Sequence, residues 1–252
     1  MAFEFALWTR EMVRAVIRRE FDVALSAVSV GRLLRTMGLS PQRPLHRAYE
    51  QNPEAVARWK REEYPAIRAA AQKDGAMIYF ADEAGIRSDY HAGTTWAPVG
   101  KTPVVHNTGA RYSINLLSAV SAQGALRFMV HDGTVNAAVF IDFCKRLLRD
   151  TPGPVYLIVD GHPAHRAKAT ARFAASTEGQ LRLFFLPGYS PELNPDEWVW
   201  KNVKHDRIGK TGVTNKADLK TKAIGALRRL QKLPNLVRAF FADPHLRYIT
   251  AN

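Results

Sequence analysis

Cysteine and long apolar segments are what this sequence most lacks. The single cysteine among 252 residues, Cys144, excludes a disulfide framework and a cysteine-based zinc site. No apolar run approaches the roughly 20 residues that span a bilayer, and the N-terminus lacks the apolar region of a signal peptide. Internal repeats and low-complexity tracts are also missing. We therefore expect a soluble cytoplasmic protein with no membrane partner.

Positive charge is abundant and unevenly distributed. The chain has 36 Lys and Arg against 23 Asp and Glu, a formal net charge of +13. Residues 198–238 carry 11 basic and 2 acidic residues, a net of +9, whereas residues 1–74 carry 13 and 9, a net of +4. Such a balance favours a polyanionic partner, of which nucleic acid is the commonest. A membrane surface, or for residues 198–238 a merely solvated face, is the alternative.

The first forty residues predict two short helices. Thr9 can cap the first helix, and a second runs from Ala27 to Met37 and ends at Gly38. The spacing places apolar side chains inward at Val13, Val16, Ile17 and Phe21, and at Val30, Leu33, Leu34 and Met37. The pair matches a DNA-binding helix-turn-helix, although other helical hairpins share the pattern. In the DNA-binding interpretation the groove is faced by Ser29, Arg32 and Arg35.

A connection and a longer helix follow. Residues Pro41–Tyr49 include Arg43 and Arg47, which would contact DNA if this segment is a wing or an extended arm. Asn52 with Pro53 then starts a helix that should end near Gly75. We expect a DNA-binding segment over residues 1–50, a linker helix over 51–75 and a catalytic domain over 76–252.

The remainder predicts an α/β domain around a mixed sheet, because strands come first, then alternate with helices, and helices close the chain. The expected strands are Met77–Ala81, Tyr112–Val120, Leu126–Val130, Val155–Val159 and Leu181–Leu186. The expected helices are Asn136–Arg149, Ala164–Ala175 and most of the chain after Pro195.

Two predicted strands end in an aspartate. Asp82 follows the apolar segment IYFA, and Asp160 follows YLIV. Ligands of open α/β sheets bind beyond the carboxyl ends of strands, so both side chains are candidates for a cleft. Either aspartate can instead cap the turn that follows it. Two acids brought close would repel each other, and a divalent cation is the usual remedy.

Glu197 is the third candidate acid. It lies in the segment YSPELNPDEW, where Asn194 fits an N-cap and Pro195 the first helical position. A glutamate at the third position can bond back to the cap, so a structural role is the alternative to a catalytic one. Lys201 follows Glu197 at i+4 and His205 at i+8, on roughly the same helical face, which suits a phosphodiester backbone.

Three carboxylates without a cysteine or histidine cluster favour Mg²⁺ or Mn²⁺ over zinc. Two such ions, about 3.5–4 Å apart, can activate a water or a 3′-hydroxyl and stabilise the leaving oxygen of a phosphodiester. Asp82 and Asp160 are the acids expected to bridge them.

The segments FADEAG, LIVDGHPAH and LPGYSPELNPDEWVWKNVK resemble the three signature blocks of DDE-type transposases of the mariner-like superfamily, in its bacterial insertion-sequence branch. LWT at Leu7–Thr9, GLS at Gly38–Ser40 and RAY at Arg47–Tyr49 also match. The resemblance covers nearly the whole chain. It implies a ribonuclease H-like catalytic domain preceded by a winged-helix segment.

Carried over by position, the resemblance makes Asp82, Asp160 and Glu197 the catalytic, metal-binding acids. Glu197 stands 37 positions after Asp160, a few more than the commonest spacing, and Glu83, Glu192 and Asp196 are neighbouring acids outside the motif positions. His162 and His165 would lie near the active site as catalytic, capping or packed residues.

The partners implied are inverted-repeat ends and target DNA, joined at TA dinucleotides by a homodimer. Lys201 and Lys204 are further candidate DNA contacts.

The resemblance leaves one departure and two rival functions. Relatives usually carry another helix-turn-helix domain ahead of this one, so we expect a truncated copy, one product of a split reading frame or an engineered fragment. An inactive copy that only binds DNA is the first rival to an active transposase. A metal-dependent nuclease that hydrolyses DNA without joining it is the second.

Overall fold

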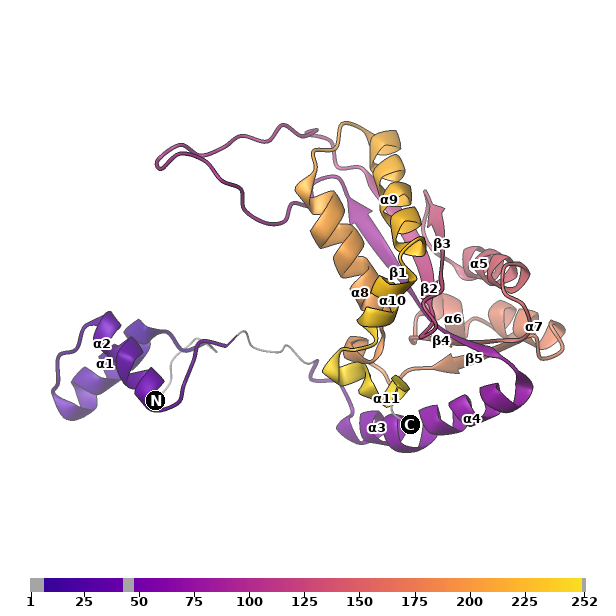
Figure 1. Ribbon diagram of the computed structural model, residues 1–252, viewed down its shortest axis with the longest axis horizontal. Helices are drawn as coiled ribbons and strands as arrows, with labels where there is room; N and C mark the ends of the chain where they lie inside the picture. The colour runs from indigo at the N-terminus through magenta and orange to yellow at the C-terminus, as the bar shows by residue number, and fades with distance from the viewer. Residues whose placement is uncertain (1–6, 43–47, 251–252) are drawn as a thin grey trace. The chain divides into compact units, whose positions relative to one another are not determined.

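The computed structural model describes residues 7–42 and 48–250. The chain divides into two compact units, Met1–Arg47 and Ala48–Asn252 (Figure 1). Within the described ranges, no helix combines the length and the apolar character that crossing a bilayer requires.

The first unit contains the two predicted helices. α1 spans Arg10–Phe21, and the Thr9 side chain accepts the N–H of Met12 at its start. α2 spans Ala27–Thr36 and is capped by Ser26, a cap that the sequence pattern did not single out. Gly38 follows with a φ of 78°, a left-handed conformation that glycine adopts without strain, so the helix ends where predicted.

The predicted inward faces of these helices are only partly confirmed. Val30 is fully buried and Leu34 is partly buried, as expected. Phe21, Leu33 and Met37 were expected inward but are exposed. Two short helices in contact bury only the row along their line of contact, which is narrower than the apolar stripe. Arg43 and Arg47 lie outside the described residues.

The second unit begins with a long helical segment. α3 (Pro53–Arg58) is capped by Asn52, passes through a π-helical turn at Trp59–Glu63 and continues as α4 (Tyr64–Asp74). Gly75 ends it with a φ of 63°. Trp59, Tyr64 and Ile67 are buried in the same hydrophobic core as the sheet, so this predicted linker helix packs within the second unit.

The central sheet is mixed, as predicted, and has the strand order β3-β2-β1-β4-β5. β1, β2 and β3 pair antiparallel, whereas β4 and β5 run parallel to β1. The strands are β1 (Met77–Arg87), β2 (Ser113–Val120), β3 (Leu126–His131), β4 (Val155–Val159) and β5 (Leu181–Phe185).

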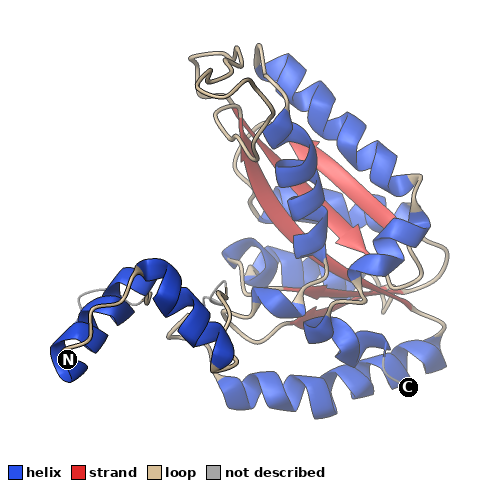
Figure 2. Cartoon of the chain, turned by 60° about the vertical axis from the view of Figure 1, so that its left-hand side comes forward, coloured by secondary structure: helices blue, strands red, loops and turns tan. Residues whose placement is uncertain are grey.

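Helices cover both faces of the sheet (Figure 2). Alternation along β1 directs Tyr79 and Ala81 into one hydrophobic cluster and Phe80 and Ala84 into another. The first cluster includes side chains of α5 (Ala137–Arg149), and the neighbouring helices are α6 (Pro163–Arg166) and α7 (Lys168–Ser176). The second includes side chains of α4, α8 (Asp196–Trp200), α9 (Lys216–Gln231) and α10 (Pro234–Phe240).

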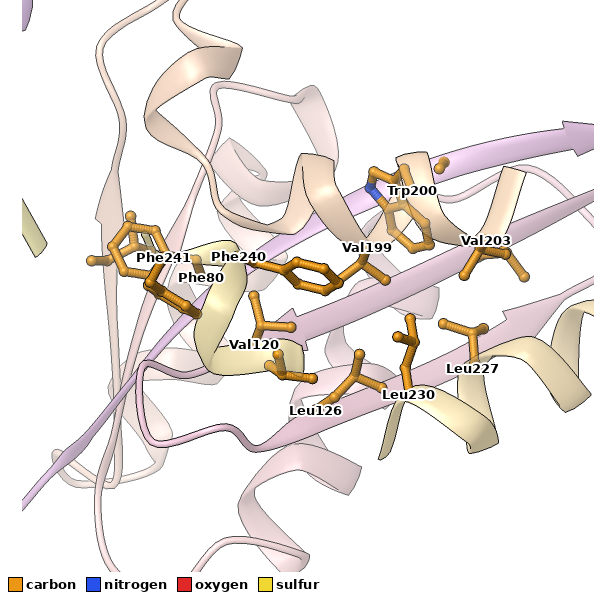
Figure 3. Close-up of a cluster of buried hydrophobic side chains, with 14 of the residues drawn as sticks. Phe80, Val120, Leu126, Val199, Trp200, Val203, Leu227, Leu230, Phe240 and Phe241 are labelled. Atoms are coloured by element: carbon orange, nitrogen blue, oxygen red, sulfur yellow. The ribbon is translucent and has the colours of Figure 1, made fainter. Parts of the chain in front are cut away.

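The α8–α9 contact forms much of the second cluster. α8 continues as a π-helix (Lys201–Arg207) and a 3₁₀ turn (Ile208–Lys210) beside α9 (Figure 1). Val199 and Val203 are fully buried near Leu227 and Leu230 of α9 (Figure 3). Each such side chain contributes about 1.5–3 kcal/mol on burial, so this contact fixes α8 against the sheet. Shorter turns lie at Pro191–Leu193 and Pro244–Leu246, before α11 (Arg247–Thr250).

Two predicted boundaries are wrong. β1 was expected to end at Asp82, but it runs on to Arg87, because β2 continues to pair with it as far as Arg87 opposite Ser113. The helix predicted over Ala164–Ala175 is instead split into α6 and α7 by the extended backbone of Ala167. Asp82 therefore lies within a strand and cannot cap a turn.

Candidate active site

Asp82 and Asp160 are brought to the same level of the sheet by strand register. β1 and β4 pair in parallel, with Phe80 opposite Ile158. Two residues further on, Asp82 is therefore level with Asp160, the first residue after β4. Adjacent strands lie about 4.8 Å apart, so the two residues are neighbours in space. Both line a cleft of about 450 Å³ together with Glu197.

Glu197 enters this cleft from the first turn of α8. Asn194 fixes the start of the helix, because its Oδ1 accepts the N–H of Asp196 and its Nδ2 donates to the carbonyl of Ala81, beside Asp82. This second bond ties the helix directly to β1. The remaining lining includes Gly188, Tyr189, Ser190 and Pro191, which form the turn before the helix.

Asp82 carries the most perturbed carboxylate of the three. Burial, with the negative charges of Glu197, Glu83 and Asp160, raises its pKa to about 8. The indole N–H of Trp200 opposes this shift by donating to Asp82 Oδ2 at 2.9 Å. The ionised carboxylate is thus unfavourable here without a further positive charge.

Asp160 has the opposite electrostatic balance. Although partial burial alone would raise its pKa, His165 and the backbone N–H of His162 hold the pKa below its usual value. Its Oδ1 accepts that N–H at 3.0 Å and lies 2.9 Å from His165 Nδ1. Asp160 therefore stabilises the following turn and also lines the cleft, so the two interpretations of this residue are compatible.

The cation with the largest effect on Glu197 is Lys204. Desolvation raises the pKa of Glu197, and the charge of Lys204 counteracts it. The nitrogen of Lys201, which was expected on the Glu197 face, lies over the ring of Trp198 at 4.1 Å from its centroid. The π-helical turn from Lys201 onward changes the spacing for the residues that follow, so the expected alignment of His205 with Glu197 does not hold as it would in an α-helix.

A fourth acid, Asp196, is completely buried behind the cleft. Both its oxygens lie within 2.8 Å of Ser118 Oγ, and Ser118 is the residue opposite Asp82 in β2. Burial and the charge of Asp82 raise the pKa of Asp196 well above its ordinary value. Burial therefore disfavours the ionised form of Asp196 relative to the neutral form.

His162 and His165 lie on the far side of Asp160. His165 is buried, with its ring 4.3 Å from that of Phe140 between centroids. Burial alone would lower its pKa, but the Asp160 and Glu83 carboxylates raise it to about 9. His162 is the N-cap of α6 and remains partly exposed.

The candidate DNA contacts of the first unit belong to α2. Arg32 and Arg35 are exposed, and Ser29 Oγ lies 2.9 Å from the Oγ of the capping residue Ser26. Lys201 is exposed in the second unit, whereas Lys204 is half-buried beside the acids.

Three positioning residues were not predicted from the sequence. Asn194 was expected only as a cap, and neither Trp200 nor Ser118 was assigned a role at the site. The spacing of Trp200, three residues after Glu197, places it one helical turn further along the same helix and is the signal that was available.

The donor set fits a divalent metal. Asp82, Asp160 and Glu197 provide carboxylate oxygens from three separate elements around one cleft. Such hard oxygen ligands suit Mg²⁺ or Mn²⁺. The repulsion that raises the pKa of Asp82 is what a bound cation would relieve.

Two known protein families match this chain. Residues 77–220 match the family described as DDE superfamily endonuclease, and residues 4–63 match a winged helix-turn-helix family. No curated protein sequence matches the chain.

Solved structures of the Mos1 mariner transposase share the fold. A paired-end complex with Mn aligns with a TM-score of 0.64 at 16% identity, over 97% of this chain and 75% of that one. A paired-end complex with Mg aligns with a TM-score of 0.56 at 16% identity, over 95% of this chain and 80% of that one. The Mos1 catalytic domain with Raltegravir and Mn aligns with a TM-score of 0.51 at 14% identity, over 81% of this chain and 99% of that one. The sheet of this chain is thus ribonuclease H-like.

Replacing Trp200 by phenylalanine tests the positioning of Asp82. Trp200→Phe removes the N–H that holds Asp82 Oδ2. We expect Mn²⁺ to bind about 10–100-fold more weakly, the usual effect of losing an outer-shell partner, as measured by electron paramagnetic resonance titration. Trp198→Phe is the matched control and should bind Mn²⁺ like the parent. Unchanged affinity in Trp200→Phe would show that the indole does not position Asp82.

Proposed function

The chain belongs to the DDE superfamily endonucleases, and we propose that it is a DNA transposase that cuts at the ends of its element and joins the freed 3′-hydroxyl to target DNA. The observation that carries the proposal is the convergence of Asp82, Asp160 and Glu197 on one cleft. Family membership supports nuclease activity, and the cleft lined by the three acids is the proposed location of the active site.

In this proposal the three acids hold two Mg²⁺ or Mn²⁺ ions. When bound, the ions would supply activation of the attacking hydroxyl and stabilisation of the leaving oxygen. The residues themselves have distinct tasks. Trp200 and Asn194 fix Asp82 and the start of the Glu197 helix, while His165 orients Asp160. Lys204 offers a positive charge beside the cleft, where a phosphate would lie.

The proposed substrate is double-stranded DNA bearing the terminal inverted repeats of the element, with TA dinucleotides as targets. Support comes from the similar fold of the Mos1 transposase, one structure of which is a paired-end complex with a left transposon end. The helices of residues 10–36 would read the repeat through Ser29, Arg32 and Arg35, together with Arg43 and Arg47 in the following segment. A homodimer on DNA would bring two ends together, in the cytoplasm at the nucleoid.

A copy that only binds DNA is the main rival. It would keep the basic surfaces and the helix-turn-helix but lack metal-dependent cleavage. The described geometry supports the active form, because all three acids line one cleft and Trp200 and Asn194 bond to Asp82 and to the neighbouring Ala81.

Nicking of inverted-repeat DNA distinguishes an active transposase from a copy that only binds DNA. With Mg²⁺, the parent protein should nick a duplex carrying the repeat, and Asp160→Asn should lose nicking by at least about 10³-fold while binding DNA equally, because one metal ligand is missing. Asp206→Asn, at an exposed acid of the same domain, is the control and should nick normally. Absence of metal-dependent nicking by the parent, with binding intact, would rule out the enzyme.

Strand-transfer products on a supercoiled plasmid would then separate a transposase from a hydrolytic nuclease.

Charge reversal tests the basic surface of residues 198–238. Lys201→Glu with Lys204→Glu should weaken DNA binding and reduce the slope of log affinity against log salt by about 0.9 for each phosphate that the protein no longer neutralises. Fluorescence anisotropy at several salt concentrations measures both quantities. Lys145→Glu, on the exposed face of α5, should leave the slope unchanged. A slope that is the same in all three proteins would identify residues 198–238 as a solvated face.

A further inference from the structure

Glu83 presents an unusual carboxylate on the opposite face of β1 from Asp82. Its side chain is only 16% exposed, on the sheet face covered by α5 and α6. Within the described part of the chain, both its oxygens are buried and accept no hydrogen bond. A desolvated carboxylate is costly unless positive charge offsets it, either from a protonated imidazole or from a bound metal ion.

Two imidazoles face these oxygens at short range. His162 Nδ1 lies 2.9 Å from Oε1, and His165 Nε2 lies 3.1 Å from Oε2. Each contact is an ion pair when its imidazole is protonated, and the Glu83 carboxylate contributes to the raised pKa of His165. The ligand atoms of the three residues all lie within 4.8 Å of one another.

We propose that Glu83, His162 and His165 form a second metal site, distinct from the acidic triad, that binds Zn²⁺ or a similar borderline transition-metal ion. One carboxylate and two imidazoles are a donor set that zinc accepts, with a further position left for water. Ligands about 2.0–2.2 Å from a tetrahedral ion stand roughly 3.3–3.5 Å apart, so the two imidazole–carboxylate distances would lengthen by a few tenths of an ångström around a bound ion.

The surroundings of the three residues suit such an ion. His165 points its other nitrogen at Asp160 Oδ1, 2.9 Å away, which is the outer-shell bond that metal-binding histidines usually make. The bond from the Ala164 N–H to His162 Nδ1 is long, at 3.3 Å, and leaves this nitrogen available. His162 is 36% exposed, which gives the ion an entry path, whereas His165 is 1% exposed.

The two sites should select different metals. The triad offers only carboxylate oxygens, which suit Mg²⁺ and Mn²⁺, whereas the Glu83 site offers mainly imidazole nitrogen, which suits zinc. Because His165 touches Asp160, an ion on His165 Nε2 would keep its proton on Nδ1, facing the catalytic acid.

Zinc titration of the full chain with a disabled triad tests the proposal. In Asp82→Asn/Glu197→Gln protein with excess Mg²⁺, calorimetry should show one tightly bound Zn²⁺ per chain. Adding His162→Asn, which retains a capping side chain for α6, should weaken zinc binding by more than about 100-fold, beyond the effect of an outer-shell change. Glu83→Gln should do the same, and His205→Ala, at an exposed histidine, should not.

Zinc-edge X-ray absorption identifies the ligands in the same protein. Two imidazoles with a carboxylate are expected. The proposal would be overturned if the triad-disabled protein bound no stoichiometric zinc, or if zinc had only oxygen ligands. It would also be overturned if adding His162→Asn and Glu83→Gln left the zinc affinity of the triad-disabled protein unchanged. Because the triad is disabled throughout, each of these results is independent of whether the parent protein nicks DNA.

Discussion

Repulsion between carboxylates shapes the catalytic half of this molecule. Asp82, Glu83, Asp160, Asp196 and Glu197 gather where β1, β4 and the start of α8 meet, and each is accommodated differently. Asp82 accepts the Trp200 indole N–H, Asp196 is buried against Ser118 with a raised pKa, and Asp160 is stabilised by His165. The positive charge of Lys204 counteracts the rise in the pKa of Glu197, and two imidazoles face the carboxylate of Glu83. The pKa of Asp82 still rises to about 8, and a divalent cation bound at the site would offset the charge of the ionised form.

The sheet makes this crowding possible. Parallel pairing of β1 with β4 sets Asp82 level with Asp160, while antiparallel pairing with β2 places Ser118 beside Asp82. Side-chain alternation then separates the acids of β1, sending Asp82 toward α8 and Glu83 toward α6. Burial of Val199 and Val203 holds α8 in place, so Glu197 is positioned by packing as well as by Asn194.

Much of this could be predicted from the sequence, because strand runs such as Val155–Val159 and caps such as Thr9 and Asn52 are local signals. The continuation of β1 past Asp82 depends on its partner β2, which local patterns do not reveal. The π-helical turn from Lys201 onward was not predicted either, and it changes the spacing between Glu197 and His205 that an α-helix would impose. Spacing shows that Trp200 lies one helical turn from Glu197, but the partners of Trp200, Asn194 and the Glu83 imidazoles lie in distant segments, so local patterns could not identify these contacts.

The central claim is that Asp82, Asp160 and Glu197 form one divalent-metal site. Anomalous X-ray scattering from crystals soaked in Mn²⁺ measures this directly. Density between the Asp82 and Asp160 carboxylates, within reach of Glu197, is the predicted result. Density confined to other parts of the molecule, or none at saturating Mn²⁺, would contradict it.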